Sequence, residues 1–165
     1  MKHLVLLSLV AVSLGCSGGQ AAPAAVSSAP ALPTSCTGTV SSQGGAAPGW
    51  VEVAGGHNNP TGIPFTMDHS QTVAGFVFGY PLRAGHPENP ANKILWVVRL
   101  PRGGSDLTIS AHPLGAATPV VTVVQPANSG PGEIYPSIVD VPTAGCWVLN
   151  LAWGAHRAAL ALPYS

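Results

Sequence analysis

The stretch that decides the fold is residues 146–162, which read CWVLNLAWGAHRAALAL. Over residues 146–153, Trp and Leu occupy every second position, and the alternation resumes over residues 156–162. Because successive side chains of a strand point to opposite faces of its sheet, this pattern predicts two strands. Gly154 and Ala155 separate them, so we expect a β-hairpin at the end of the chain.

Upstream segments continue the same architecture. Six more stretches read as strands: residues 50–53, 73–80, 93–100, 106–111, 120–124 and 134–141. Residues 101–104 form a Pro/Gly turn cluster, which predicts a hairpin between the strands on either side of it. About eight short strands joined by turns predict an all-β fold, a two-sheet antiparallel sandwich. A small closed barrel is the alternative.

Composition excludes several classes of function. The chain has 165 residues, with 20 Gly, 17 Pro and only 7% charged residues, and its formal net charge is zero. Gly and Pro disfavour helices and suit short strands joined by turns. The chain has no basic stripe that could neutralise phosphates, so we expect no nucleic-acid binding. It has no polybasic segment for an anionic membrane either.

The N-terminus reads as an export signal. A short basic start is followed by an apolar run over residues 4–14, which is too short to span a bilayer. The run ends at Gly15 and Cys16, an arrangement that resembles a bacterial lipobox. We therefore predict a signal peptide over residues 1–15 and a lipid on Cys16, which would anchor the protein to a membrane. Ordinary cleavage further along, for example after Ala22, is the alternative.

The Ala/Pro/Ser-rich stretch that follows the anchor lacks periodic apolar positions. Residues 16–35 are therefore predicted to be the lipidated Cys and a disordered linker, and residues 36–165 the sandwich domain. If Cys16 carries the lipid, Cys36 and Cys146 remain as a pair, and outside the cytoplasm such thiols usually oxidise. An unpaired Cys36 is the alternative. The predicted location is extracytoplasmic, in the periplasm or at the cell surface.

The C-terminal part of the chain resembles a group of bacterial proteins. Tyr135-Pro136-Ser137, Gly145-Cys146-Trp147 and the pattern LxWGxH that ends at His156 resemble an uncharacterised family of small secreted bacterial lipoproteins, and residues 93–97 fit the same group. The resemblance covers about residues 75–165. It implies an immunoglobulin-like sandwich and a lipid anchor, and it implies no activity.

Candidate chemical groups are few and scattered. Asp68-His69-Ser70 contains the residue types of a hydrolytic triad, but a triad is built from residues that converge in space, so a polar turn is the preferred interpretation. Among the histidines, His57, His69 and His86 are weak candidates for a metal site, because no metal-binding spacing supports them. We expect no cofactor. Five aromatic residues at strand period are predicted to pack in the core rather than form a sugar-binding platform: Phe76, Phe78, Trp96, Trp147 and Trp153. Trp50 is the better candidate for an exposed aromatic.

Three functions remain open from the sequence. The favoured one is a non-enzymatic lipoprotein of the cell envelope, whose domain binds another envelope protein. The second is a ligand-binding module for a metal ion or a glycan. The third, a hydrolase with a site assembled from loops, rests only on Asp68 and His69.

Overall fold

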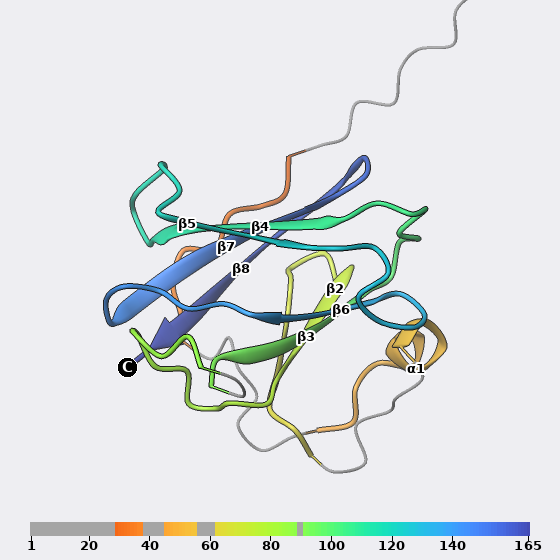
Figure 1. Ribbon diagram of the computed structural model, residues 1–165, viewed down its shortest axis with the longest axis horizontal. Helices are drawn as coiled ribbons and strands as arrows, with labels where there is room; N and C mark the ends of the chain where they lie inside the picture. The colour runs from red at the N-terminus through yellow and green to blue at the C-terminus, as the bar shows by residue number, and fades with distance from the viewer. Residues whose placement is uncertain (1–28, 38–44, 56–61, 89–90) are drawn as a thin grey trace, which may run out of the picture.

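The computed structural model describes residues 29–37, 45–55, 62–88 and 91–165, and it forms two four-stranded antiparallel sheets that pack face to face (Figure 1). Sheet A has the order β1-β2-β3-β6, and its strands are Phe65–Met67, Val73–Val77, Lys93–Val98 and Ile134–Ile138. Sheet B has the order β5-β4-β7-β8, and its strands are Val121–Gln125, Leu107–Pro113, Gly145–Trp153 and His156–Tyr164. The predicted two-sheet sandwich is confirmed.

The core between the sheets is built around three tryptophans that are almost fully buried: Trp96, Trp147 and Trp153. Each indole N–H donates a hydrogen bond, to Ser137 Oγ at 2.9 Å, to Thr143 O at 2.9 Å and to Leu100 O at 3.1 Å respectively. A buried N–H without an acceptor costs free energy, so these bonds allow large rings to fill the core. The prediction that these three residues are core residues is confirmed.

Sheet A brings Trp96 against a glycine. Gly75 pairs directly with Trp96 in the β2–β3 register, and a Cβ at Gly75 would lie 2.6 Å from Cζ3 of the Trp96 ring. No side chain larger than hydrogen fits there without a shift of the ring. The absence of a side chain at Gly75 in β2 therefore leaves the space that the Trp96 ring occupies.

The terminal hairpin is confirmed, with β7 and β8 paired from Trp153↔His156 to Gly145↔Tyr164. The hairpin predicted around residues 101–104 is wrong. β3 and β4 lie in different sheets, so this turn crosses from one layer of the sandwich to the other. Arg102 holds the crossing: its Nη1 donates to Ile134 O at 2.9 Å, and its backbone N–H donates to Glu133 Oε2 at 2.7 Å.

The strand predicted over residues 50–53 is also wrong, because Gly49–Gly55 form the short helix α1. The helix packs Val51, fully buried, together with Trp50 and Ala54 on the outer face of sheet A. A sequence of four residues is too short to distinguish the period of a strand from that of a helix. The helix forms because it buries Val51 against sheet A. Trp50 is half-buried in this outer cluster, so its prediction as an exposed aromatic is wrong.

Several strands end earlier than predicted. β2 stops at Val77, which leaves Phe78 and Tyr80 beyond the strand and 49% and 41% exposed. The prediction that Phe78 packs in the core is wrong, and Phe76 packs in the outer cluster under α1. Within the described residues no helix has the length and hydropathy needed to cross a membrane. The predicted signal peptide and Cys16 lie outside the described residues, as does the linker up to residue 28.

Candidate functional site

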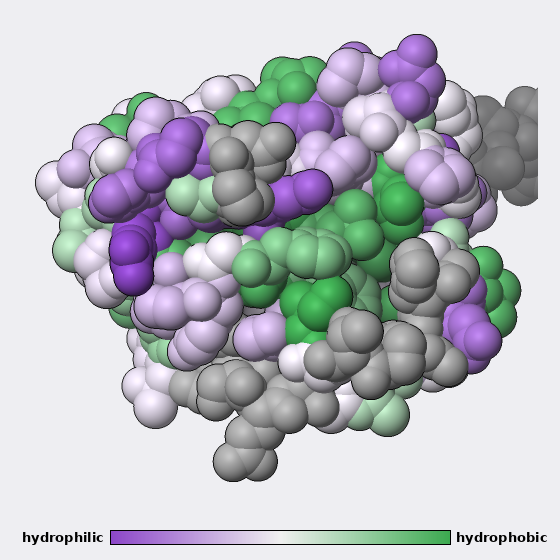
Figure 2. Space-filling model, turned by 60° about the horizontal axis from the view of Figure 1, so that its bottom comes forward, coloured by the Kyte–Doolittle hydropathy of each residue, from purple (hydrophilic) through white to green (hydrophobic). Residues whose placement is uncertain are grey.

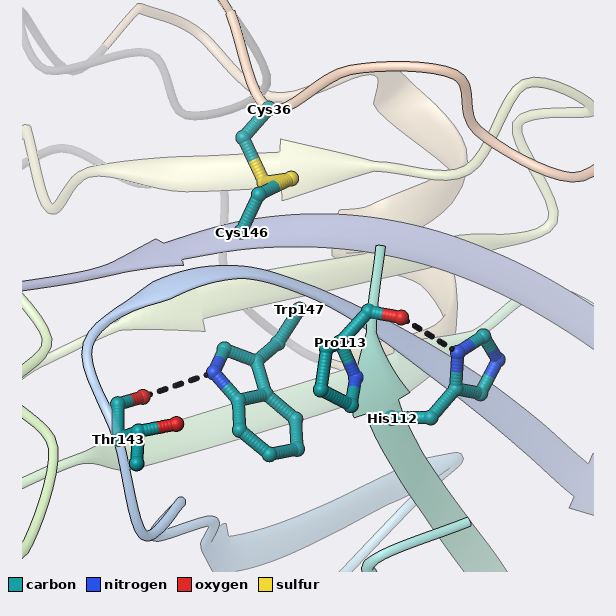
Figure 3. Close-up of a disulfide and its surroundings, with 6 residues drawn as sticks. All are labelled: Cys36, His112, Pro113, Thr143, Cys146 and Trp147. Carbon is teal, nitrogen blue, oxygen red and sulfur yellow. Dashed lines mark hydrogen bonds between the residues drawn. A yellow bond between two sulfur atoms is a disulfide. The ribbon is translucent and has the colours of Figure 1, made fainter. Parts of the chain in front are cut away.

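Cys36 and Cys146 form a disulfide with their Cα atoms 5.7 Å apart (Figure 3). The predicted pairing is confirmed. Cys146 lies near the start of β7, whereas Cys36 lies in an extended segment that belongs to neither sheet. The disulfide therefore attaches the chain that enters the domain to a central strand of sheet B, and it does not join two strands.

The residues just before Cys36 lie against the domain. Residues 31–34, here called the N-terminal strap, line two hollows in the surface. One, of 410 Å³, lies between the strap, β1 and β8, and the other, of 450 Å³, lies between the strap, His112 and Val148. Leu32 at the mouth of both is 65% exposed. The end of the predicted linker thus follows the sandwich while staying largely in solvent.

His112 occupies the floor of the second hollow, 6% exposed, near the disulfide (Figure 3). Its Nδ1 lies 3.0 Å from Pro113 O, and its Nε2 lies 3.1 Å from Asn150 Nδ2. A carbonyl only accepts, so Nδ1 is the donor toward Pro113 O. Both ring nitrogens are engaged, which favours a structural role for His112 over proton transfer or metal binding.

Asp68 organises the turn between β1 and β2. Its Oδ1 accepts from the backbone N–H groups of Thr72 and Val73, both at 2.6 Å, and its Oδ2 accepts from Ser70 N at 3.0 Å. A short acidic side chain bonded to the N–H groups ahead of it closes a turn. The interpretation of Asp68-His69-Ser70 as a polar turn is confirmed, and His69 is exposed on its surface.

A second polar network shapes the long loop between β2 and β3. Asn92 is 1% exposed and has a φ of 54°, a conformation that Asn adopts more readily than most residues. Its Oδ1 accepts from Arg83 N at 2.9 Å, and its Nδ2 donates to Arg83 O at 2.6 Å and to Asp140 Oδ1 at 2.9 Å. Asp140 Oδ1 also accepts from His86 N at 2.9 Å. These bonds fix the loop against the end of β6.

The fixed loop surrounds a hollow of 250 Å³ whose rim carries Tyr80, Arg83, His86 and Glu88. His86 Nδ1 lies 2.9 Å from Glu88 Oε1, and this hydrogen bond lowers the pKa of the Glu88 carboxyl. Figure 2 shows the molecule from the side of sheet A. Hydrophilic residues gather on the left of this view, and hydrophobic residues reach the surface across the middle. The loop thus offers aromatic and charged groups side by side, a combination that suits small polar ligands.

Of the residues on this rim, only His86 is a candidate from the sequence, as a weak candidate for a metal site. The organising residues of the loop, Asn92 and Asp140, are 48 positions apart, and nothing in their local sequence predicts that they meet. The exposure of Phe78 and Tyr80 had a signal, because Gly79 and Pro81 break the strand pattern at that point. Lys93 Nζ lies 5.7 Å from the centre of the Phe78 ring, which adds a cation beside the exposed aromatics.

The predicted metal candidates do not come together in the described part of the chain. His69 lies on the β1–β2 turn and His86 on the β2–β3 loop, while His57 lies outside the described residues. Across residues 29–37, 45–55, 62–88 and 91–165, no group of three or more His, Cys, Asp or Glu side chains is placed to hold a metal ion. His156 packs beside Trp153, with the ring centres 5.5 Å apart.

Comparisons with known proteins give one structural match. No protein-family model and no curated protein matches this chain. A crystal structure described as "a Putative Lipoprotein from Bacillus anthracis" aligns with 63% of this chain and 79% of its own, at 18% sequence identity and a TM-score of 0.45. Similarity at this level assigns neither a family nor a function.

Proposed function

We propose that this protein is a lipid-anchored extracytoplasmic domain that binds another component of the bacterial envelope and performs no catalysis. The observation that carries the proposal is the Cys36–Cys146 disulfide. Disulfides persist in oxidising compartments outside the cytoplasm and are rare within it. This location agrees with the export signal read at the N-terminus.

The cysteine inventory supports the lipid anchor. The chain has three cysteines, and the disulfide uses Cys36 and Cys146, so Cys16 is left at the end of the apolar run. Lipidation needs one cysteine that is not consumed by a disulfide. The exposed N-terminal strap gives the chain a surface path from such an anchor to the domain.

The side chains of Asp68 and His112, which are of types found in catalytic sites, are occupied by structural hydrogen bonds, and this favours binding over catalysis. Asp68 accepts four hydrogen bonds within its own turn, and His112 has both ring nitrogens engaged by Pro113 and Asn150. A general base needs a free lone pair within reach of its substrate. Groups that already close turns and link strands are poor candidates for this role.

Two measurements in the organism of origin test the proposal. Cys16→Ser should move the protein from the membrane fraction to the soluble one, while the Cys36–Cys146 disulfide still forms. Chemical crosslinking of intact cells should capture the same envelope component repeatedly. Retention of Cys16→Ser in the membrane fraction would contradict the anchor. Turnover of an envelope substrate by the purified protein would contradict the absence of catalysis.

The hollow in the β2–β3 loop favours a second candidate function, the binding of a small anionic or glycan ligand. The rim carries Arg83 and Tyr80, which offer a guanidinium to an anionic group and a ring to a sugar face, while His86 is already paired with Glu88. A panel of acidic oligosaccharides should raise the melting temperature of the protein, and Arg83→Ala should abolish that rise. An equal rise in the melting temperatures of the unmodified protein and Arg83→Ala would contradict binding at this site.

A further inference from the structure

β5 is an edge strand with an unusual composition. It pairs with β4 on one side, and no described strand pairs with it on the other. Thr122 and Val124 of β5 are exposed, Val124 at 53%, and Val120, which stands just before the strand, is 57% exposed. A strand edge carries backbone N–H and C=O groups that can pair with another chain. Exposed valines beside such an edge make pairing more favourable, because the contact also buries apolar surface.

The edge lacks the charges that normally prevent pairing. Residues 107–132 contain no Asp, Glu, Lys or Arg, and β5 lies within this range. Natural edge strands are commonly protected by charged side chains, especially Lys. Here Pro119 and Pro126 stand just outside the paired residues. Proline cannot donate to a sheet, so pairing along this edge is confined to residues 120–125, of which Val120 already donates its N–H to Ala111 O of β4.

Sheet A approaches this edge without pairing with it. At the C-terminal end of β5, a groove of 400 Å³ separates Gln125 from Pro136, Ser137 and Ile138 of β6, and Lys93 of β3 also lines it. The two sheets approach here without joining into a closed barrel. A strand added to β5 would therefore lie beside this groove at its Gln125 end.

The sequence of the edge is complementary to itself. Residues 120–124 read VVTVV, which is the same in both directions. In an antiparallel pair of two copies centred on Thr122, Val120 of one copy lies opposite Val124 of the other, and the two Thr122 residues face each other. Thr122 and Val124 alternate with Val121 and Val123, which pack against the core, and Val120 is exposed beside them. No like charges meet. Opposed β-branched side chains stabilise antiparallel strands.

We propose that two copies of this chain associate through their β5 edges, antiparallel and centred on Thr122, to form a continuous eight-stranded sheet. Each copy has a single β5 edge, and the contact uses the same surface on both copies. Such two-fold contacts close at the dimer and do not propagate into fibres.

The affinity of this contact depends on the proposed anchor. Six residues of strand bury less surface than the roughly 1,200 Å² of a stable complex, so pairing in dilute solution should be weak. Two copies tethered to one membrane meet at a far higher effective concentration. The dimer is therefore expected on the membrane, and this step rests on the proposed function.

The test uses the full-length protein in membranes of the cells that make it. Thr122→Cys supplies a thiol at the proposed two-fold axis, and a short bis-maleimide crosslinks two such thiols. Val53→Cys is the matched control, because Val53 is 89% exposed on α1 and lies outside the proposed contact. We expect the Thr122→Cys protein to give at least ten times more crosslinked dimer than Val53→Cys.

Two charged variants of Thr122→Cys test the register. Val120→Lys with Val124→Lys places like charges opposite each other, and we expect at least a ten-fold loss of dimer. Val120→Lys with Val124→Glu places opposite charges across an antiparallel pair, and we expect the dimer to be retained. In a parallel pair both variants would repel, so equal loss in the two contradicts the proposed register.

Each sample is also fractionated, and the Cys36–Cys146 disulfide is checked by mass spectrometry to confirm folding. Membrane-bound protein that crosslinks no better than Val53→Cys would overturn the dimer and leave the anchor intact. Protein found in the soluble fraction would overturn the anchor. In that case sedimentation at millimolar concentration decides the dimer, with a monomer contradicting it.

Discussion

Reduction of the Cys36–Cys146 disulfide should lower the free energy of unfolding. The size of the loss tells whether the N-terminal strap stays on the sandwich without the disulfide. The two cysteines lie 110 residues apart. Closing a loop of this size in the unfolded chain costs about 5 kcal/mol by the chain-entropy relation. If the strap keeps its place on the sandwich after reduction, all of this stabilisation is lost.

If the strap leaves the sandwich, the native state also gains freedom. In the oxidised native state the disulfide ties Cys36, which precedes Gly49 at the start of α1 by 13 residues in the sequence, and releasing a segment of this length returns about 3 kcal/mol on the same relation. The net loss is then about 2 kcal/mol. Because Leu32 is 65% exposed and the strap belongs to neither sheet, we expect this lower value.

Urea unfolding followed by tryptophan fluorescence measures the loss, since Trp96, Trp147 and Trp153 are buried in the core. The oxidised protein is compared with the protein in a phosphine reductant. Cys36→Ala with Cys146→Ala is the control, and it should unfold at one urea concentration with or without reductant. An unchanged midpoint on reduction would refute the loop argument, and a loss near 5 kcal/mol would show that the strap docks unaided.

Three further predictions concern the core and its turns. Gly75→Ala should destabilise the protein by about 2 kcal/mol in urea, because its Cβ would meet Trp96, and this cost should shrink in a Trp96→Phe background. Asp68→Ala should cost about 2 kcal/mol, whereas His69→Ala should change stability by less than about 0.5 kcal/mol; comparable losses would contradict the turn assignment. Burial raises the pKa of Tyr164, so the folded state holds this proton more tightly than the unfolded state. The contribution of Tyr164 to stability should therefore stay constant below about pH 10 and be lost above it, and the stability of Tyr164→Phe should fall less between pH 9 and pH 11, which thermal unfolding at each pH measures.

Strand alternation carried most of the fold prediction. A strand with one face on the core and the other face near solvent has a sequence in which apolar residues alternate. This pattern located the ends of β7 and β8 to within two residues. The pairing of Cys36 with Cys146 followed from cysteine number and compartment. The strand positions depend on the local sequence pattern, and the disulfide pairing depends on the number of cysteines.

The errors came from properties that a local pattern does not contain. The turn at Arg102 looks like a hairpin, but its contacts with Ile134 and Glu133, distant in sequence, direct the chain into the other sheet. The helix at Val51 depends on the outer face of sheet A, which forms only when the strands assemble. The loop hollow likewise depends on Asn92 meeting Asp140.

Mass spectrometry of the N-terminal peptide from the membrane fraction tests the central claim most directly. The proposed lipid anchor predicts a mature chain that begins at Cys16 and carries diacylglycerol on its sulfur. A mature chain that begins after Ala22, recovered from the soluble fraction without a lipid, would contradict the anchor.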